Sequence, residues 1–289
     1  MHLNHKISSN ISFTSRKELN KLIVNIFEPL AYFILEELDY GPKVEIIINP
    51  YVNEGLYIIS KDIEENDNKF YLFKDINEKI KNNAINEKDL MNNKNLVISL
   101  NELDIISKIL DIKELNVENF GFLEDKKIIG DEKYNNIKII DFIPSNNNNN
   151  CNCYNDLLSR KTNGIDLTDK NIIGRIILYN DNNNNKNQIL TEAFQKIKNK
   201  IKDKNLKDIL EKCLNSFINI LETERGNNSD EIMLMDPNEF RKRKNYEFLG
   251  FQNIDSNKPY YYPNIKSELE SYIQNIINNF NDIENNLIK

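Results

Sequence analysis

Three side chains between residues 111 and 142 have the types and the order that phosphoryl transfer needs. The stretch DIKELNVENFGFLEDKKIIGDEKYNNIKIIDF contains an acid at Glu114, an amide five residues later at Asn119, and a second acid at Asp141. In phosphoryl transfer a carboxylate lies near the attacking hydroxyl, while an Asn and an Asp hold Mg²⁺. Glu114 is therefore the candidate base or hydroxyl positioner, and Asn119 and Asp141 are the candidate metal ligands.

Two short strands are the elements expected around these side chains. FGFL at residues 120–123 and IKII at residues 137–140 are apolar runs on either side of a charged loop, a pattern that predicts a hairpin. The order of loop, hairpin and terminal Asp-Phe resembles the protein-kinase-like family, in which a loop D-x-x-x-x-N precedes a hairpin that ends in D-F. The chain looks most similar to the divergent, atypical members that keep NFGF and IDF in place of complete H-R-D and D-F-G signatures.

Segments upstream extend this resemblance to roughly residues 20–145. The stretches FEPLAYFILEELDYGPKVEIIINP and GLYIISKDI are similar to the family's succession of a Glu-bearing helix, a Gly-Pro turn, two strands and a hinge. The resemblance implies that Glu28 is the helix Glu. It also implies that Ser60, Lys61 and Asp62 form the hinge that passes the adenine of ATP.

The family uses its helix Glu to hold a Lys against the phosphates, and the sequence does not assign this Lys. Lys6, in LNHKIS, lies 22 residues before Glu28 and is a candidate on a surviving strand. Arg16 and Lys17 are alternatives on a predicted helix. Surface positions for all three basic residues are the competing interpretation.

Three departures from the family pattern bear on activity. Glu114 replaces an Asp, and its extra methylene moves the carboxylate by about 1 Å, which matters where catalysis depends on positioning. The 27 residues before Glu28 contain no glycine, so we expect no glycine-rich cover over the phosphates and a reduced N-terminal lobe. Ile143 replaces the Gly of D-F-G. The pattern fits an active phosphotransferase that uses ATP and Mg²⁺ on a protein or small-molecule hydroxyl, or a pseudokinase that serves as a binding or scaffold module.

Ordinary structural roles are the alternative for each candidate. In so Asn-rich a chain, Asn119 is also a typical turn residue, and Asp141 is a typical strand-end or helix-cap residue. Glu114 suits a solvated helix end. Glu28 suits the first turn of a helix, where the helix dipole favours an acid. The candidate site therefore depends on the joint order of these residues.

Apolar spacing predicts an α+β protein with a small strand-containing N-terminal part and a larger helical C-terminal part, and the resemblance implies a two-lobed, protein-kinase-like organisation. Residues 1–62 would form the reduced N-lobe, and residues 63–289 a mainly helical C-lobe that contains the catalytic-like loop at 111–142. Helical spacing marks residues 16–26, 27–38, 97–112, 189–201, 206–221 and 266–288, and Asp236-Pro237 would start a further short helix. KVEIIINP and GLYIIS predict a hairpin. Asn tracts predict a disordered insert over about residues 144–188, with one strand at 172–179.

Composition excludes several classes of function. The net charge of −7 and the pI near 5.2 give no basic face for nucleic acid. There is no export signal and no run approaching the roughly 20 apolar residues that span a bilayer, so we expect an intracellular, cytoplasmic protein without a membrane partner. The three Cys and two His lack zinc-finger spacing.

The C-terminal third suggests a different enzyme class. EIMLM at residues 231–235 and KNYEFLGFQ at residues 244–252 resemble parts of acetyltransferase-like folds, including the antizymes. The glycine-rich turn that those enzymes need for acetyl-coenzyme A is lacking. No motif in this third identifies a substrate, so the expected partners are a nucleotide and an unknown protein or small molecule.

Overall fold

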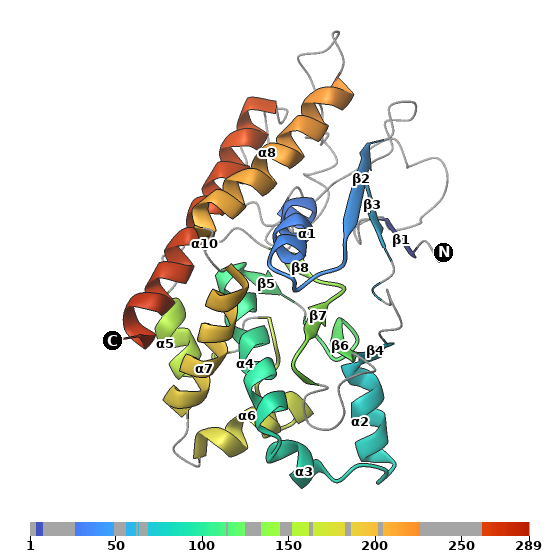
Figure 1. Ribbon diagram of the computed structural model, residues 1–289, viewed down its shortest axis with the longest axis vertical. Helices are drawn as coiled ribbons and strands as arrows, with labels where there is room; N and C mark the ends of the chain where they lie inside the picture. Colours follow the sequence, from blue (N-terminus) through green and yellow to red (C-terminus); the bar gives the residue numbers. More distant parts are fainter. Residues whose placement is uncertain are drawn as a thin grey trace, which may run out of the picture.

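The computed structural model is an α+β arrangement of small antiparallel sheets and a larger group of helices (Figure 1). It describes residues 4–7, 27–48, 56–61, 63, 69–113, 115–124, 134–144, 152–161, 164–182, 186–201, 205–225 and 262–288. Within these ranges no helix has both the length and the apolar character that a membrane crossing requires. The expected helices at 16–26 and 236–237, and both acetyltransferase-like stretches, lie outside the described residues.

The described strands form three small antiparallel sheets. They are β1 (Asn4–Ile7), β2 (Val44–Ile48), β3 (Leu56–Ser60), β4 (Lys69–Leu72), β5 (Ile112–Lys113), β6 (Phe120–Glu124), β7 (Ile137–Ile139) and β8 (Ile143–Pro144). The sheet orders are β1-β3-β2, β4-β6-β7 and β5-β8. Both predicted hairpins are confirmed, because β2 pairs with β3 and β6 pairs with β7 in antiparallel register.

Strand β4 reaches β6 closely because Gly121 has no side chain. A Cβ at this position would lie 2.1 Å from the backbone oxygen of Tyr71 on β4. Leu72 lies opposite Gly121 in the register of the two strands. A glycine is therefore required here for the third strand to pair with the β6–β7 hairpin.

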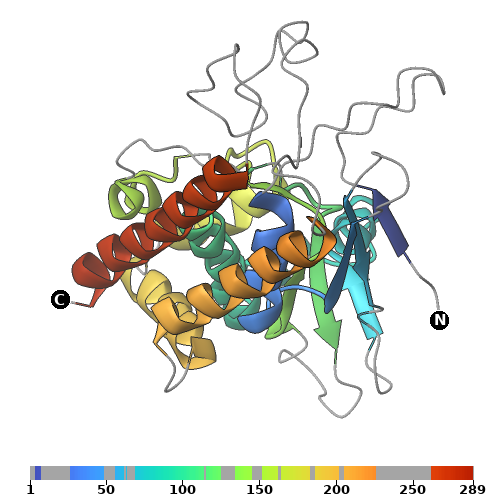
Figure 2. The same cartoon turned by 90° about the horizontal axis from the view of Figure 1, so that it is seen from above.

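The described helices make up most of the fold. They are α1 (Phe27–Glu37), α2 (Phe73–Lys81), α3 (Glu87–Met91), α4 (Lys94–Ile109), α5 (Cys153–Leu158), α6 (Ile172–Asn182), α7 (Lys186–Ile201), α8 (Leu206–Arg225) and α10 (Tyr262–Leu287). Helix α4 is central: every residue from 96 to 109 is buried. Helices α5, α6, α7 and α10 all pack against it (Figure 2). The predicted helix at 97–112 is thus confirmed over residues 97–109, whereas Ile112 belongs to β5.

Helix α1 lies between the β1-β3-β2 sheet and the C-terminal helices (Figures 1 and 2). It contacts β2 on one side and α8 on the other. The helix ends in a left-handed turn, in which Asp39 has a φ of 57°. The backbone N–H groups of Tyr40 and Gly41 both donate to the Leu35 carbonyl, at 2.7 and 3.0 Å. This closure satisfies a terminal carbonyl of α1 and turns the chain toward β2.

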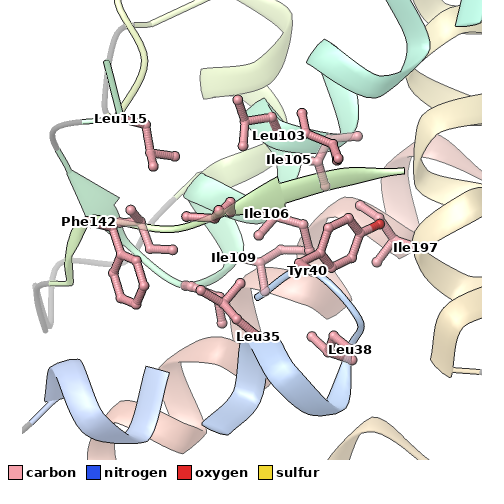
Figure 3. Close-up of a cluster of buried hydrophobic side chains, with 14 of the residues drawn as sticks. Leu35, Leu38, Tyr40, Leu103, Ile105, Ile106, Ile109, Leu115, Phe142 and Ile197 are labelled. Carbon is pink, nitrogen blue, oxygen red and sulfur yellow. The ribbon is translucent and has the colours of Figure 1, made fainter. Parts of the chain in front are cut away.

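One hydrophobic core joins the strand-containing and helical parts of the described chain. Figure 3 shows Leu35 of α1, Ile106 of α4 and Ile197 of α7 gathered in one cluster with Phe142, which follows β7. These four side chains are at most 1% exposed. The same cluster includes buried residues of β2 and β3. Packing therefore fixes α1 against the segments that carry the candidate site.

The strand predicted at 172–179 is wrong, because these residues belong to α6. Ile172, Ile173, Ile176 and Ile177 are buried with helical spacing. The side chain of Asn171 accepts a hydrogen bond from the Ile173 backbone N–H at 3.0 Å, next to the start of the helix. The run IIGRIIL contains β-branched residues, which favour strands, but burial of one helical face outweighs this preference.

Helices α5 and α6, together with the start of α7, also lie within residues 144–188, where the Asn tracts predict a disordered insert. That prediction is wrong for these segments. Cys153 and Leu157 of α5 are buried, and α6 packs against α3, α4 and α7. Apolar residues between the Asn tracts supply enough buried surface to order the segment, which composition averaged over the whole range conceals.

Candidate functional site

The closed β6–β7 hairpin brings Asn119 and Asp141 together. Asn119 immediately precedes β6, and Asp141 follows β7 by two residues. The backbone oxygen of Asn119 accepts hydrogen bonds from the N–H groups of Ile140 at 2.8 Å and Asp141 at 3.3 Å. Both residues are partly exposed. The two candidate metal ligands are therefore neighbours at the open end of the hairpin, with access to solvent.

The loop before Asn119 is a hydrogen-bonded turn. The Asn119 N–H donates to the Asn116 carbonyl at 3.0 Å, and the Asn116 side chain accepts from the Glu118 N–H at 2.8 Å. Asn residues suit this geometry because their side chains mimic a backbone turn. Asn119 is thus held both by its own turn and by the segment after β7.

Lys74 of helix α2 contacts the same loop at two residues. The backbone N–H of Lys74 donates to the Val117 carbonyl at 2.9 Å, and the Lys74 Nζ lies 2.7 Å from the Glu118 carboxylate. The hydrogen bond to Glu118, with the charge of that carboxylate, raises the pKa of Lys74. The ion pair is solvent-exposed and contributes little stability by itself. It nevertheless fixes which side of the loop faces α2.

Tyr32 of α1 links that helix to the segment after β7. Its hydroxyl donates to the Ile140 carbonyl at 3.0 Å, and its ring centroid is 4.5 Å from that of Phe142. Phe142 is fully buried and points toward α1 (Figure 3). The residues on either side of Asp141 are therefore both anchored on Tyr32. Sequence reasoning missed Tyr32, although its position one helical turn after Glu28 was a usable signal.

Glu28 lies in the first turn of α1 and is 1% exposed. Because Tyr32 follows it by four residues, both belong to one face of the helix. A charged carboxylate is retained in such a buried position only when it is paired or hydrogen-bonded. Glu28 is therefore not the solvated first-turn acid of the simpler interpretation.

Lys6 lies on β1, as predicted for a surviving strand. The register puts Lys6 opposite Ile58 of β3, which is in turn opposite Ile46 of β2. Ile46 and Ile58 belong to the buried core, so β1 extends a sheet whose other two strands carry core residues. The alternatives Arg16 and Lys17 lie outside the described residues.

The predicted hinge is described only in part. Ser60 is the last residue of β3 and pairs with Val44 of β2. Lys61 follows it, donates its backbone N–H to the Lys43 carbonyl at 2.8 Å, and has its Nζ 3.5 Å from Glu45 on the surface. Asp62 lies outside the described residues, as does the candidate base Glu114. The roles assigned to these residues remain predictions.

A magnesium site is compatible with the residues at the hairpin end. No group of three or more His, Cys, Asp or Glu side chains suited to a metal occurs among the described residues. Mg²⁺ does not need such a group, because it is commonly bound by one or two protein carboxylates together with substrate phosphates and water. Asn119 and Asp141 would supply one amide oxygen and one carboxylate. This donor set fits Mg²⁺ held jointly with a nucleotide.

A separate cavity of about 180 Å³ lies between α2 and the β4–β6 strand pair. Its lining residues are Tyr71, Asp75, Ile76, Lys79, Ile85, Phe122, Glu124 and Tyr134. It includes neither Asn119 nor Asp141, and it mixes both signs of charge with aromatic rings. No local sequence pattern indicates this cavity, because its walls come from three separate segments.

We also compared the chain with known proteins. No protein-family model, curated protein or solved structure matches this chain.

Proposed function

We propose that this chain is an atypical kinase-like protein that binds ATP and Mg²⁺ at Asn119 and Asp141. It would transfer phosphate to a hydroxyl group of a protein or small molecule. The observation that carries this proposal is the contact between the two candidate ligands, in which the Asn119 carbonyl accepts the Asp141 N–H at 3.3 Å. Residues 22 positions apart in the sequence thus meet in the order that kinase-like phosphoryl transfer uses.

The surroundings of Asp141 give independent support. In protein kinases the packing of the Phe after the metal Asp distinguishes active from inactive states, and a helix Glu pairs with a strand Lys. Here Phe142 packs on Tyr32 of α1, one turn after the buried Glu28. Lys6 lies on β1, a strand that precedes α1 in the chain. These features fit a nucleotide site bounded by α1, β1 and the β6–β7 hairpin.

The chain's own residues have separate roles in this proposal. Asn119 and Asp141 would hold Mg²⁺, which neutralises phosphate charge when bound. Glu28 would orient Lys6 toward the phosphates, and Glu114 would accept or orient the proton of the attacking hydroxyl. Ser60, Lys61 and Asp62 would border the adenine. Catalysis would thus come from positioning and electrostatics, as expected for phosphoryl transfer.

A pseudokinase is the second candidate function. Glu114 in place of Asp displaces the carboxylate by about 1 Å, enough to lower the rate of a reaction that depends on position. The residues before Glu28 also contain no glycine for a phosphate cover. Under this alternative the site binds nucleotide without turnover, and the folded chain acts as a binding module.

Melting temperature measured with ATP, in the presence and absence of Mg²⁺, tests nucleotide binding. A ligand at a hundredfold excess over its Kd that binds only the folded state adds roughly 2.7 kcal/mol to stability. Asp141→Asn should abolish the Mg²⁺-dependent part of the shift. The matched control is Asp169→Asn at an exposed position before α6, which should leave the shift unchanged. Absence of any shift at millimolar ATP would reject both nucleotide-binding functions.

Turnover separates the enzyme from the pseudokinase. Mg²⁺-dependent ATP hydrolysis that is lost in Glu114→Gln, while the thermal shift is kept, would establish the enzyme. A normal shift without hydrolysis in the wild type would favour the pseudokinase.

A further inference from the structure

The last helix of the described chain, α10, completes the end of α4 that leads into the candidate site. The final carbonyls of an α-helix have no partner within the helix and need one from elsewhere. Two side chains of α10 supply it. The Tyr272 hydroxyl donates to the Leu110 carbonyl at 2.7 Å, and the Asn279 amide donates to the Ile109 carbonyl at 3.2 Å.

These two donors act as a unit. Tyr272 and Asn279 are seven residues apart, which places them two turns apart on the same face of α10. Asn279 is 8% exposed and Tyr272 is 1% exposed. Burial, with the nearby Asp111 carboxylate, raises the pKa of the Tyr272 hydroxyl well above its ordinary value, so the hydroxyl remains a donor. The α4 terminus is therefore held by buried hydrogen bonds from a helix more than 150 residues later, since Tyr272 and Leu110 are 162 positions apart.

The residues that directly follow this end of α4 are the first residues of the catalytic-like loop. Asp111, directly after Leu110, adopts a left-handed conformation with a φ of 46°. The chain then pairs through β5 with β8 and continues to Leu115, whose N–H donates to the Gly164 carbonyl at 2.8 Å. A change in the direction of the α4 terminus would move this whole segment relative to Asn119.

Tyr272 also contacts the start of α1. Its ring centroid is 5.1 Å from that of Phe27, the residue before Glu28. At the other end of α1, Lys212 of α8 forms an ion pair with Glu37. One side chain of α10 thus touches both the beginning of the loop that leads to Asn119 and the beginning of the helix that carries Glu28.

We infer that Tyr272 and Asn279 are positioning residues, which fix residues 111–113 and 115–119 relative to the first turn of α1. The effect of this positioning on nucleotide and metal binding rests on the proposed function. This positioning assigns a role to α10, for which the sequence offered no motif. Tyr272 and Asn279 would act through the α4 terminus and Phe27, without contacting the nucleotide themselves.

Hydrogen exchange in the nucleotide-free protein tests the positioning role directly. Tyr272→Phe keeps the ring contact with Phe27 and removes the hydroxyl. We expect exchange at the Leu115 and Asn119 amides to rise about fivefold, the factor by which loss of one buried hydrogen bond increases a local opening equilibrium. Asn279→Leu, which removes the other donor at similar volume, should raise exchange at the same amides.

Tyr40→Phe is the matched control. The Tyr40 hydroxyl is also buried and donates to α4, at Glu102, at 2.8 Å, but Glu102 lies eight residues before Leu110 in the sequence, about two helical turns away. This variant should lose stability without a selective rise at Leu115 and Asn119. Equal increases across the whole chain in Tyr272→Phe, or no increase at these two amides, would overturn the inference.

Nucleotide affinity distinguishes the two proposals. If the wild type binds ATP with Mg²⁺, Tyr272→Phe should weaken that binding about fivefold while leaving the affinity measured without Mg²⁺ unchanged, because the displaced group is the metal ligand Asn119. An equal loss in both conditions would contradict positioning of the metal ligand. A wild type that never binds ATP rejects the proposed function, and the exchange measurement then decides the role of Tyr272 alone.

Discussion

At the scale of single residues, Tyr32 connects α1 to the candidate site through two contacts. Its hydroxyl bonds to the Ile140 carbonyl and its ring packs on Phe142, so it contacts the residues before and after Asp141. The two contacts are separable, because Phe retains the ring and lacks the hydroxyl. Tyr32 thus allows the backbone restraint on Asp141 to be tested apart from core packing.

Tyr32→Phe should lower the free energy of unfolding by about 1 kcal/mol, the usual contribution of one intramolecular hydrogen bond. The Mg²⁺-dependent thermal shift with ATP should also shrink, since Asp141 loses a restraint on its backbone. Urea titration measures the first effect. Tyr179→Phe is the control, because Tyr179 is 42% exposed on α6 and should change stability by less than about 0.5 kcal/mol. Equal losses in the two variants would refute the role of the Tyr32 hydroxyl.

Lys200, in the last turn of α7, has a pKa that the fold lowers strongly. Its Nζ lies 3.7 Å from the centroid of the Tyr40 ring and 3.0 Å from the Asp39 carbonyl. Burial lowers the pKa of this amine to about 8, against the opposing charges of Glu102 and Asp39. Lys138 and Lys196 lower it further. The folded protein therefore releases this proton at a lower pH than the unfolded chain does.

Stability should rise with pH because of Lys200. Between about pH 8 and the ordinary lysine pKa of about 10.4, the unfolded state binds more protons, so the free energy of unfolding increases with pH. Relative to Lys200→Met, the wild type should gain about 2 kcal/mol over this range. Urea titrations of both proteins at several pH values give this difference, with exposed Lys207→Met as control. A pH-independent difference between wild type and Lys200→Met would count against the burial effect.

At the scale of elements, α6 shows that the Asn-rich region contributes to the core. Ile176 is fully buried, and α6 packs on α3, α4 and α7. Gly174 permits the tight start of this helix, since a Cβ there would lie 2.0 Å from the Thr168 backbone oxygen. Helix α6 is thus packed into the core through apolar contacts. Its Gly174 is required because the Thr168 backbone leaves no room for a side chain.

Ile176→Ala should lower the free energy of unfolding by about 3 kcal/mol, because it removes buried methyl groups and leaves a cavity. Thermal or urea unfolding measures the change. The matched substitution on the exposed face of the same helix is Tyr179→Ala, which should cost less than about 1 kcal/mol. Equal, small effects at both positions would indicate that α6 does not belong to the cooperative core.

At the scale of the whole molecule, a buried ionic network joins three separate segments. Asp104 of α4 pairs with Lys108 on the same helix and lies 3.3 Å from Arg160, which follows α5. Arg160 in turn lies 2.7 Å from Asp181 of α6. Asp104, Lys108 and Arg160 have side chains at most 5% exposed. Charges buried to this degree are tolerated only when each is paired, so the network requires all its members.

Asp104→Asn should lower the free energy of unfolding by about 3 kcal/mol, because it leaves Lys108 and Arg160 buried with less compensating charge. Glu45→Gln, which removes the surface pair with Lys61, should change it by less than about 1 kcal/mol. Urea unfolding of both variants compares the two environments. Similar losses for the buried and the exposed pair would show that burial is not what makes the network important.

Local patterns were sufficient for the parts of the fold that involve neighbours in the sequence. Helical spacing predicted α1, α4, α7, α8 and α10, and paired apolar runs predicted the β2–β3 and β6–β7 hairpins. Closure of the second hairpin already requires Asn119 and Asp141 to be close, because antiparallel strands bring their outer ends together. The proximity of the two candidate ligands is therefore predictable from sequence.

Only the tertiary structure decided which side chains support those ligands and which state the ambiguous segments adopt. Tyr32 meets Ile140 across 108 positions, and Tyr272 meets Leu110 across 162. No short pattern encodes such distant pairs. The run at 172–179 satisfies both strand and helix preferences, and burial against α3, α4 and α7 selects the helix. The sequence by itself determined the order of the candidate groups, whereas long-range packing determined what holds them in place, because that packing depends on contacts between elements that local propensity does not specify.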